Sequence, residues 1–140
     1  MPFRVRGDAS STRSRQAQQA VTRSGKQRAG GLWRSGHLVF VGGIGGWYPE
    51  RRPDGPGDVR RQFSDALDTM KGSLEKAGSS MAHVLSVRVP LVDPAKNESA
   101  LVEVFNEHFP EPRPALSCFG VVGFRRPGQL LQVDCIAYIE

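Results

Sequence analysis

The spacing of apolar residues changes along this chain from strand-like alternation to helical periodicity and back, and this change constrains the fold. A helical stripe runs from 59 to 77, with Asp58 at an N-cap position and Gly78 at a C-terminal stop. Its residues recur at steps of three and four: Val59, Phe63, Ala66, Leu67, Met70, Leu74 and Ala77. A second helix is expected over Pro94 to His108. The sequence therefore predicts two amphipathic helices that each need a sheet to pack on.

Alternating segments on either side of these helices predict the strands of that sheet. A strand is expected over 37–41, closed by paired glycines, and another over 84–92, with Leu85, Val87, Val89 and Leu91 on one face and Val84, Ser86 and Arg88 on the other. Pro90 inside the second segment indicates an edge strand or a strand end. Strands over 115–122 and 130–139 complete the order β, β, α, β, α, β, β, whose first strand is the least defined. This order is typical of an α+β fold with both helices on one face of a mixed sheet.

The last strand, "LLQVDCIAYI", also predicts a partner. Its odd-numbered residues from Leu131 to Ile139 are all apolar and should meet the helices. Its even-numbered residues from Leu130 to Tyr138 mix apolar with polar side chains, a combination that seldom faces bulk water. We expect another copy of the chain to cover this face, which makes the protein a homo-oligomer.

The net charge of +5 belongs to the N-terminal part of the chain. Residues 1–36 carry eight basic side chains against Asp8 alone. The sequence predicts a leader over 1–30 and one globular domain over 31–140. A flexible tail, an organelle-targeting segment and a nucleic-acid tether are three interpretations of the leader, with nucleic acid ranked last.

Composition excludes several classes of protein. No apolar run reaches the roughly 18 residues that span a membrane, and no secretory signal opens the chain. Cys118 and Cys135 are too few for a disulfide framework, so reduced thiols in a cytoplasmic protein are expected. The three scattered histidines form no metal-ligand spacing. We expect no metal and no cofactor.

Several segments in colinear order resemble the Rid family of YjgF-like enamine/imine deaminases. They are "GHLVFVGG", "LEKAG", "VLSVRVPLVD", "FNEHFPEPRPALSCFGV" and "LLQVDCIAYIE", and they cover about residues 36–140. The resemblance implies the chorismate-mutase-like α+β fold and a homotrimer around a central β-barrel. It also implies ligand clefts between subunits, where reactive imines or enamines are hydrolysed to a 2-keto acid and ammonia.

The same resemblance implies a site that differs from that of deaminating members. The family's P-A-R-S/T-C pattern, whose arginine binds the substrate carboxylate, reads Pro114 to Cys118 here and has Leu116 in place of the arginine. The family's pocket glutamate falls at Gln132, and the serine after the first strand falls at Gly42. The implied catalytic residues are Gln132, Ser117 and Cys118, with Cys118 contributing shape rather than a nucleophile. Gly43 is an implied ligand-binding residue.

Without the arginine, two interpretations of the pocket are open. The pocket could be apolar, with the ligand bound by Leu116, Phe119, Trp47, Tyr48 and also Trp33. Another cation could instead replace the arginine: Arg113, Arg125 and Arg126 are expected to be solvated surface residues, and Arg88 to pair with Asp134.

The function expected from these residues is catalysis on a reactive imine or enamine with altered specificity. Efficient deamination of 2-aminoacrylate is not expected. The alternative is a trimeric small-molecule-binding protein without catalysis, and an endoribonuclease-like or RNA-binding role ranks third.

Overall fold

The computed structural model describes residues 27–29, 32–35 and 37–140 of the chain. Within these residues, six strands and two long helices follow in the order β1, β2, β3, α2, β4, α3, β5, β6, with a short 3-10 turn, η1, before β4. Their bounds are β1 Gln27–Ala29, β2 Leu32–Ser35, β3 Leu38–Gly45, α2 Val59–Lys76, η1 Met81–His83, β4 Val84–Val92, α3 Pro94–His108, β5 Ala115–Val121 and β6 Gln132–Tyr138. The predicted leader falls largely outside the described residues, although the sheet already begins at Gln27.

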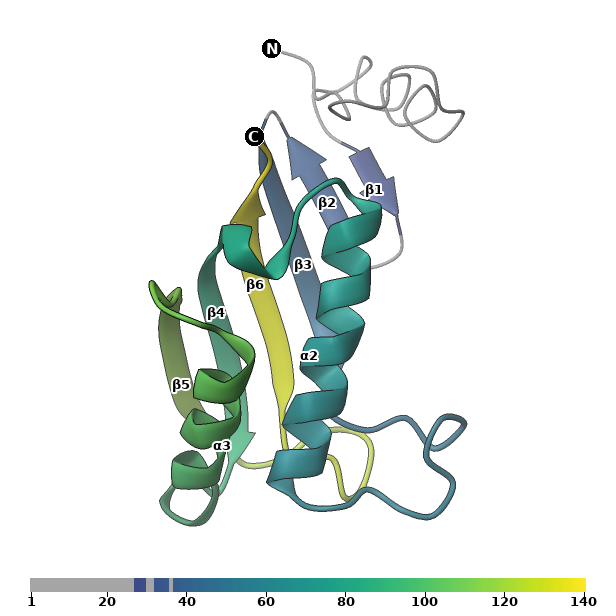
Figure 1. Cartoon of the computed structure of the whole chain (residues 1–140). Coiled ribbons are helices and arrows are strands. Elements are labelled where there is room, and N and C mark those ends of the chain that lie inside the picture. The colour runs from purple at the N-terminus through teal and green to yellow at the C-terminus, as the bar shows by residue number, and fades with distance from the viewer. Residues whose placement is uncertain (1–26, 30–31, 36) are drawn as a thin grey trace.

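The strands form one mixed sheet in the order β1-β2-β3-β6-β4-β5. All neighbouring pairs are antiparallel except β4 and β5, which are parallel. Helices α2 and α3 lie side by side on one face of the sheet (Figure 1). The predicted α+β arrangement, with both helices on one face of a mixed sheet, is therefore confirmed.

The sequence predicted both helices closely. The Asp58 carboxylate accepts a hydrogen bond of 3.0 Å from the backbone N–H of Arg61, so it caps α2 as expected. Gly78, just past the end of α2, has a φ of 88° that favours glycine. Helix α3 spans the predicted residues. The apolar stripe of α2 is buried against β3 and β6, and it forms the centre of the core.

Strand β3 does not end at Val41 as predicted, because its paired glycines form a bulge instead of a turn. The pairing with β6 shifts between Val41 and Ile44, and Gly43 has a φ of 74°. The backbone N–H of Gly43 turns away from the ladder and donates a 2.8 Å hydrogen bond to the Asp134 carboxylate. A bulge keeps the strand in the sheet while it redirects the backbone, so the strand continues to Gly45.

One residue of β4 lies on the opposite face from the one predicted, again because the pairing with β6 is irregular. Leu85 was expected on the same face as the buried Val87 and Val89, but its side chain is 47% exposed, while Val84 is buried. The register between β4 and β6 is irregular between Val84 and Ser86, and a shift of one residue moves a side chain to the other face. Strand β4 is also internal rather than an edge. Pro90 is accommodated where the regular pairing with β6 has ended at Arg88.

The face of the sheet opposite the helices, which we call the open face, is partly apolar. The odd-numbered residues of the last strand are buried against the helices, and the even-numbered ones are half-buried on the open face, as predicted. Among the described residues, Leu38, Phe40, Leu85 and Phe119 are large apolar side chains with more than a third of their area exposed. Neither α2 nor α3 is both long and apolar enough to cross a membrane.

Candidate functional site

A hollow of about 380 Å³ lies where the bulged strand β3, the loop after it and the loop between β5 and β6 meet. We call it the glutamine hollow. Its lining is polar and cationic for most of its area, and its residues are Gly43, Gly45, Tyr48, Phe124, Arg125, Arg126, Gln129 and Gln132. Three residues singled out from the sequence, Gly43, Tyr48 and Gln132, are therefore brought together by the fold. The Gln132 side chain has no hydrogen-bond partner in the described part of the chain.

Tyr48 is anchored at this hollow by its hydroxyl, and its ring is flanked by two arginines. The Tyr48 hydroxyl accepts a 2.8 Å hydrogen bond from the backbone N–H of Gly45. The guanidinium carbons of Arg51 and Arg126 lie 4.9 and 4.8 Å from the centre of its ring, which is the range of cation–π contacts. Trp47 turns to a second hollow of about 220 Å³, where its indole N–H donates to the Arg52 carbonyl.

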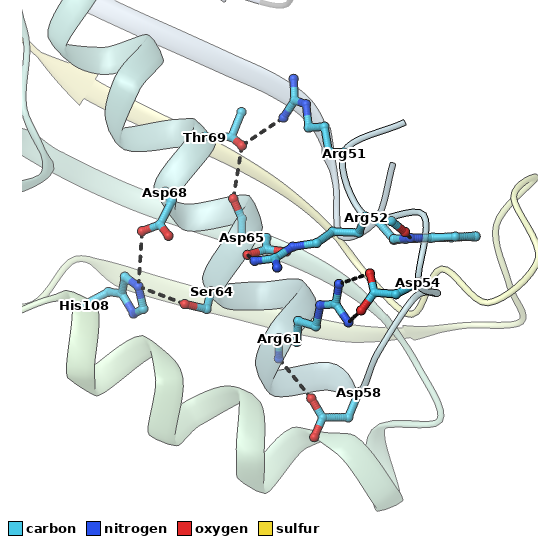
Figure 2. A network of polar contacts seen from close by, with 11 residues as sticks. Arg51, Arg52, Asp54, Asp58, Arg61, Ser64, Asp65, Asp68, Thr69 and His108 are labelled. Atoms are coloured by element: carbon cyan, nitrogen blue, oxygen red, sulfur yellow. Dashed lines mark hydrogen bonds and ion pairs between the residues drawn. The ribbon is translucent and has the colours of Figure 1, made fainter. Parts of the chain in front are cut away.

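The loop that carries Trp47 and Tyr48 is pinned to α2 by two arginine–aspartate pairs (Figure 2). Arg52 donates two hydrogen bonds of 3.0 and 2.9 Å to Asp65, and Arg61 donates two of 3.0 and 2.8 Å to Asp54. The hydrogen bonds from Arg61 hold the pKa of Asp54 below its ordinary value. Such paired contacts fix direction as well as distance, so the loop has a defined path beside the hollow.

The loop between β5 and β6 is positioned by Gln62, which sequence analysis missed. Gln62 lies on the buried stripe of α2; its amide donates to the Gly128 carbonyl at 2.9 Å and accepts from the Leu130 N–H at 2.8 Å. The sequence did contain a signal for this role, namely a polar residue on the otherwise apolar stripe of α2. A buried amide needs hydrogen-bond partners, so such a residue indicates a contact with another segment.

Arg126 is the second residue that the sequence did not place correctly. Its Nη1 donates to the Trp47 carbonyl at 2.6 Å and lies 3.4 Å from the Gln129 Oε1 atom. It is half-buried in the glutamine hollow, so the expectation of a solvated surface residue is wrong for Arg126. Arg113 and Arg125 are exposed, and Arg113 pairs with Glu111. The glutamine hollow, with two arginines and two glutamines in its lining, is not the apolar pocket considered from the sequence, which stays a prediction. The Trp33 side chain lies outside the described part of the structure.

The β5 residues singled out from the sequence are not gathered with Gln132 within one chain. Strand β4 lies between β5 and β6, so β5 forms the edge of the sheet. Leu116 and Cys118 are half-buried and pack against the core, whereas Ser117 and Phe119 are exposed. Cooperation of these residues with the hollow therefore requires a second copy of the chain.

Neither thiol is suited to act as a nucleophile near neutral pH. Burial raises the pKa of Cys118, with a smaller contribution from Glu98. Burial likewise raises the pKa of Cys135 to about 12. The thiolate is the reactive form of cysteine, so both residues remain protonated and inert.

A third hollow, of about 380 Å³, lies on the open face between Phe40, Ser86, Arg88, Asp134 and Ile136. Arg88 and Asp134 are cross-strand neighbours, but the described residues show no ion pair between them. Asp134 accepts from Gly43 instead, and the Arg88 guanidinium lies 5.4 Å from the centre of the Phe119 ring.

A serine, a histidine and an aspartate also meet between α2 and α3, away from the hollows (Figure 2). The Ser64 hydroxyl and the Asp68 carboxylate lie 3.5 and 3.7 Å from the same His108 nitrogen, Nε2. The His108 Nδ1 lies 3.0 Å from the Val104 carbonyl, to which it donates. In a catalytic triad the acid and the nucleophile contact different ring nitrogens, so this trio stabilises helix packing.

Comparison with known proteins agrees with this fold. The family model described as Endoribonuclease L-PSP matches residues 31–139. A RutC family protein of Pyrococcus abyssi is 33% identical over 106 residues, which make up 75% of this chain and 81% of that protein. A 3-aminoacrylate deaminase RutC of Acinetobacter baylyi is 31% identical over 106 residues, covering 76% and 82%.

Solved structures show the same likeness. A member of the YjgF/YER057c/UK114 family from Mycobacterium tuberculosis has a TM-score of 0.68 at 28% identity, covering 78% of this chain and 85% of that one. RidA from an Antarctic Psychrobacter has a TM-score of 0.70 at 26% identity, covering 81% and 89%. This chain therefore belongs to the endoribonuclease L-PSP family of YjgF-like proteins and has the fold of that family.

Proposed function

We propose that this protein hydrolyses a small reactive imine or enamine in the glutamine hollow. The observation that carries the proposal is the gathering of Gly43, Tyr48 and Gln132 around one polar hollow. The likeness to a 3-aminoacrylate deaminase supports it, because 3-aminoacrylate is an enamine. The reaction converts C=N and water into C=O and ammonia, and it requires no cofactor.

Imine hydrolysis needs little activation of the substrate by the protein, since an imine carbon is already electrophilic. The hollow must hold the substrate and orient one water molecule, which are effects of proximity and hydrogen bonding. The amide of Gln132, which has no partner among the described residues, can orient the water, but it cannot accept a proton near neutral pH. The proton released by the attacking water therefore goes to the substrate nitrogen, which leaves as ammonia.

We also propose that three copies of the chain assemble through their open faces. The exposed apolar side chains Leu38, Phe40 and Phe119 support such an interface. The number three comes from the family resemblance. In this assembly the edge strand β5 of one copy, with Leu116, Ser117, Cys118 and Phe119, would border the glutamine hollow of the next. The catalytic and ligand-binding residues expected from the sequence would then form one inter-subunit cleft.

The full chain should release ammonia from 2-iminopropionate generated in situ faster than buffer does, but more slowly than a family member that carries the arginine. The physical reason is the missing charged contact at Leu116. Ammonia formation, corrected for spontaneous hydrolysis, is the measurement. A rate equal to that of buffer for both imines and enamines would favour the non-catalytic binding protein. RNA cleavage by the purified chain would favour the third function.

Restoring the cation gives a second test. Leu116→Arg should raise kcat/KM for carboxylate-bearing imines by about tenfold or more, because a charged hydrogen bond in a partly buried site is worth about 1.5–3 kcal/mol. Leu116→Gln is the matched control, since it is polar and uncharged. Equal rates for both variants would show that position 116 does not border the substrate.

A further inference from the structure

We propose that Arg126 binds the carboxylate of the substrate, as the cation of a site to which Leu116 contributes none. The proposal rests on the proposed function for the identity of the rest of the substrate. What it adds to that function is a residue: the carboxylate, which the family resemblance already implies for the substrate, is held by a cation from the loop between β5 and β6.

The Arg126 guanidinium is oriented before any ligand arrives. Its Nη1 is tied to the Trp47 carbonyl at 2.6 Å and lies 3.4 Å from the Gln129 amide oxygen. Its guanidinium carbon lies over the ring of Tyr48, 4.8 Å from the ring centre. The Nε and Nη2 atoms have no acceptor among the described residues. An anchored guanidinium with an unused edge is the donor arrangement that a carboxylate accepts in two-point contact.

The positive charge in the hollow is not neutralised by the part of the chain that the structure describes. Neither Arg125 nor Arg126 makes an ion pair there. The nearby acids are already engaged: Asp54 pairs with Arg61, and Asp65 pairs with Arg52. Asp134 accepts from the Gly43 N–H. An unpaired, half-buried cation in a small hollow favours an anionic ligand.

Size and lining limit the rest of the ligand. About 380 Å³ is at the lower end of the range of small-molecule sites, and the hollow contains the aromatic side chains of Tyr48 and Phe124. Gln132 contributes an amide without a partner in the described structure. A ligand with a carboxylate at Arg126 and a polar reacting carbon near Gln132 would satisfy both groups. This arrangement fits a short-chain 2-imino acid better than a large apolar ligand.

Pyruvate, the stable 2-oxo acid with the same carboxylate, is the probe for this site. We expect pyruvate titration to shift the amide resonances of Gly43 and Gly45 in the full-length wild-type protein. Arg126→Gln should weaken the dissociation constant by about tenfold or more, as expected for the loss of a charged two-point contact. Arg51→Gln is the matched control: Arg51 also rests on the Tyr48 ring, but it lines the second hollow. It should change the affinity less than about twofold.

A second variant and a second ligand separate the loss of the carboxylate contact from a change in the conformation of the loop that Arg126→Gln could cause. Arg126→Lys keeps the charge but loses the planar fork, so its affinity should fall between those of wild type and Arg126→Gln. Pyruvamide, which has no charge, should bind weakly to the wild type and should not respond to either substitution. Each of the following outcomes would overturn the proposal: no pyruvate binding to the wild type, unchanged affinity in Arg126→Gln, or an equal loss in Arg51→Gln.

The same variants separate this proposal from the proposed function. Pyruvate binding that depends on Arg126, without ammonia release from any imine, would support the carboxylate site and contradict the hydrolase. Imine hydrolysis at equal rates by wild type and Arg126→Gln would support the hydrolase and contradict the carboxylate site.

Discussion

At the scale of single residues, the site is defined by what surrounds each polar group. Gln62 and Gln132 are both glutamines, yet one is fully buried with both ends of its amide bonded, and the other is half-buried and free in the described structure. The first is a structural residue and the second is available to a ligand. Sequence alone cannot separate them, because the two shortest hydrogen bonds of the Gln62 amide are to residues 66 and 68 positions away in the chain.

Cys135 gives a pH-dependent prediction at this scale. Burial raises the pKa of its thiol from 9.0 to about 12 in the folded protein. The unfolded chain therefore loses this proton at lower pH than the folded chain does. The contribution of Cys135 to stability is complete below pH 9.0 and is lost as the pH rises from 9.0 toward about 12.

The measurement is the free energy of unfolding in urea across this pH range. The wild type should lose stability more steeply with rising pH than Cys135→Ala, which has no thiol to ionise. The cavity left by alanine lowers the free energy of unfolding by the same amount at every pH. Parallel plots of this free energy against pH for the two proteins would therefore contradict the prediction.

At the scale of elements, the loops beside the glutamine hollow are set by helix α2. Asp65 and Arg61 on α2 hold the loop that carries Tyr48, and Gln62 holds the loop that carries Arg126. One face of one helix thus orients both sides of the hollow. A stable helix lets two irregular segments keep the defined geometry that binding requires.

Replacing Gln62 by leucine tests this arrangement. Gln62→Leu leaves the Leu130 N–H and the Gly128 carbonyl without partners, so it should lower the free energy of unfolding by about 1–3 kcal/mol. Gln132→Leu is the matched control, because its side chain has no partner in the described structure. It should change stability by less than about 0.5 kcal/mol while it reduces imine hydrolysis. Similar losses of stability in both variants would contradict the distinction drawn between the two glutamines.

At the scale of the whole molecule, the sheet has two unlike faces. The helices cover one, and the open face presents Phe40 and Phe119, which are 39% and 41% exposed, together with half-buried residues of β6. The edge strand β5 carries four of the residues expected at the site but lies across β4 from Gln132. A single copy of the chain therefore holds only part of the cleft that the family resemblance implies.

We expect the wild type to be a trimer in solution and Phe40→Asp to be a monomer, because a buried unpaired carboxylate at the interface is costly. Size-exclusion chromatography with light scattering measures the mass of each. Lys96→Asp, an equally drastic change at an exposed position on α3, should remain trimeric. A wild-type monomer, or a Phe40→Asp trimer, would contradict assembly through the open face.

The sequence by itself determined the features that depend on neighbours along the chain. The stripe of α2, its Asp58 cap, the bounds of α3 and the two faces of β6 all follow from local periodicity, and the structure confirms them. The resemblance to the family also rests on colinear segments, so the fold was predictable from them.

Tertiary structure alone decided the features that depend on contacts between distant segments. The bulges at Gly43 and near Leu85 arise where two strands pair out of step, which neither strand shows on its own. Arg126 enters the glutamine hollow because Gln62, Trp47 and Gln129 hold its loop there. Periodicity is a property of one segment, whereas register and loop position are set by free-energy contributions from several segments at once. For this reason the elements could be predicted from the sequence, and the cation at the candidate site could not.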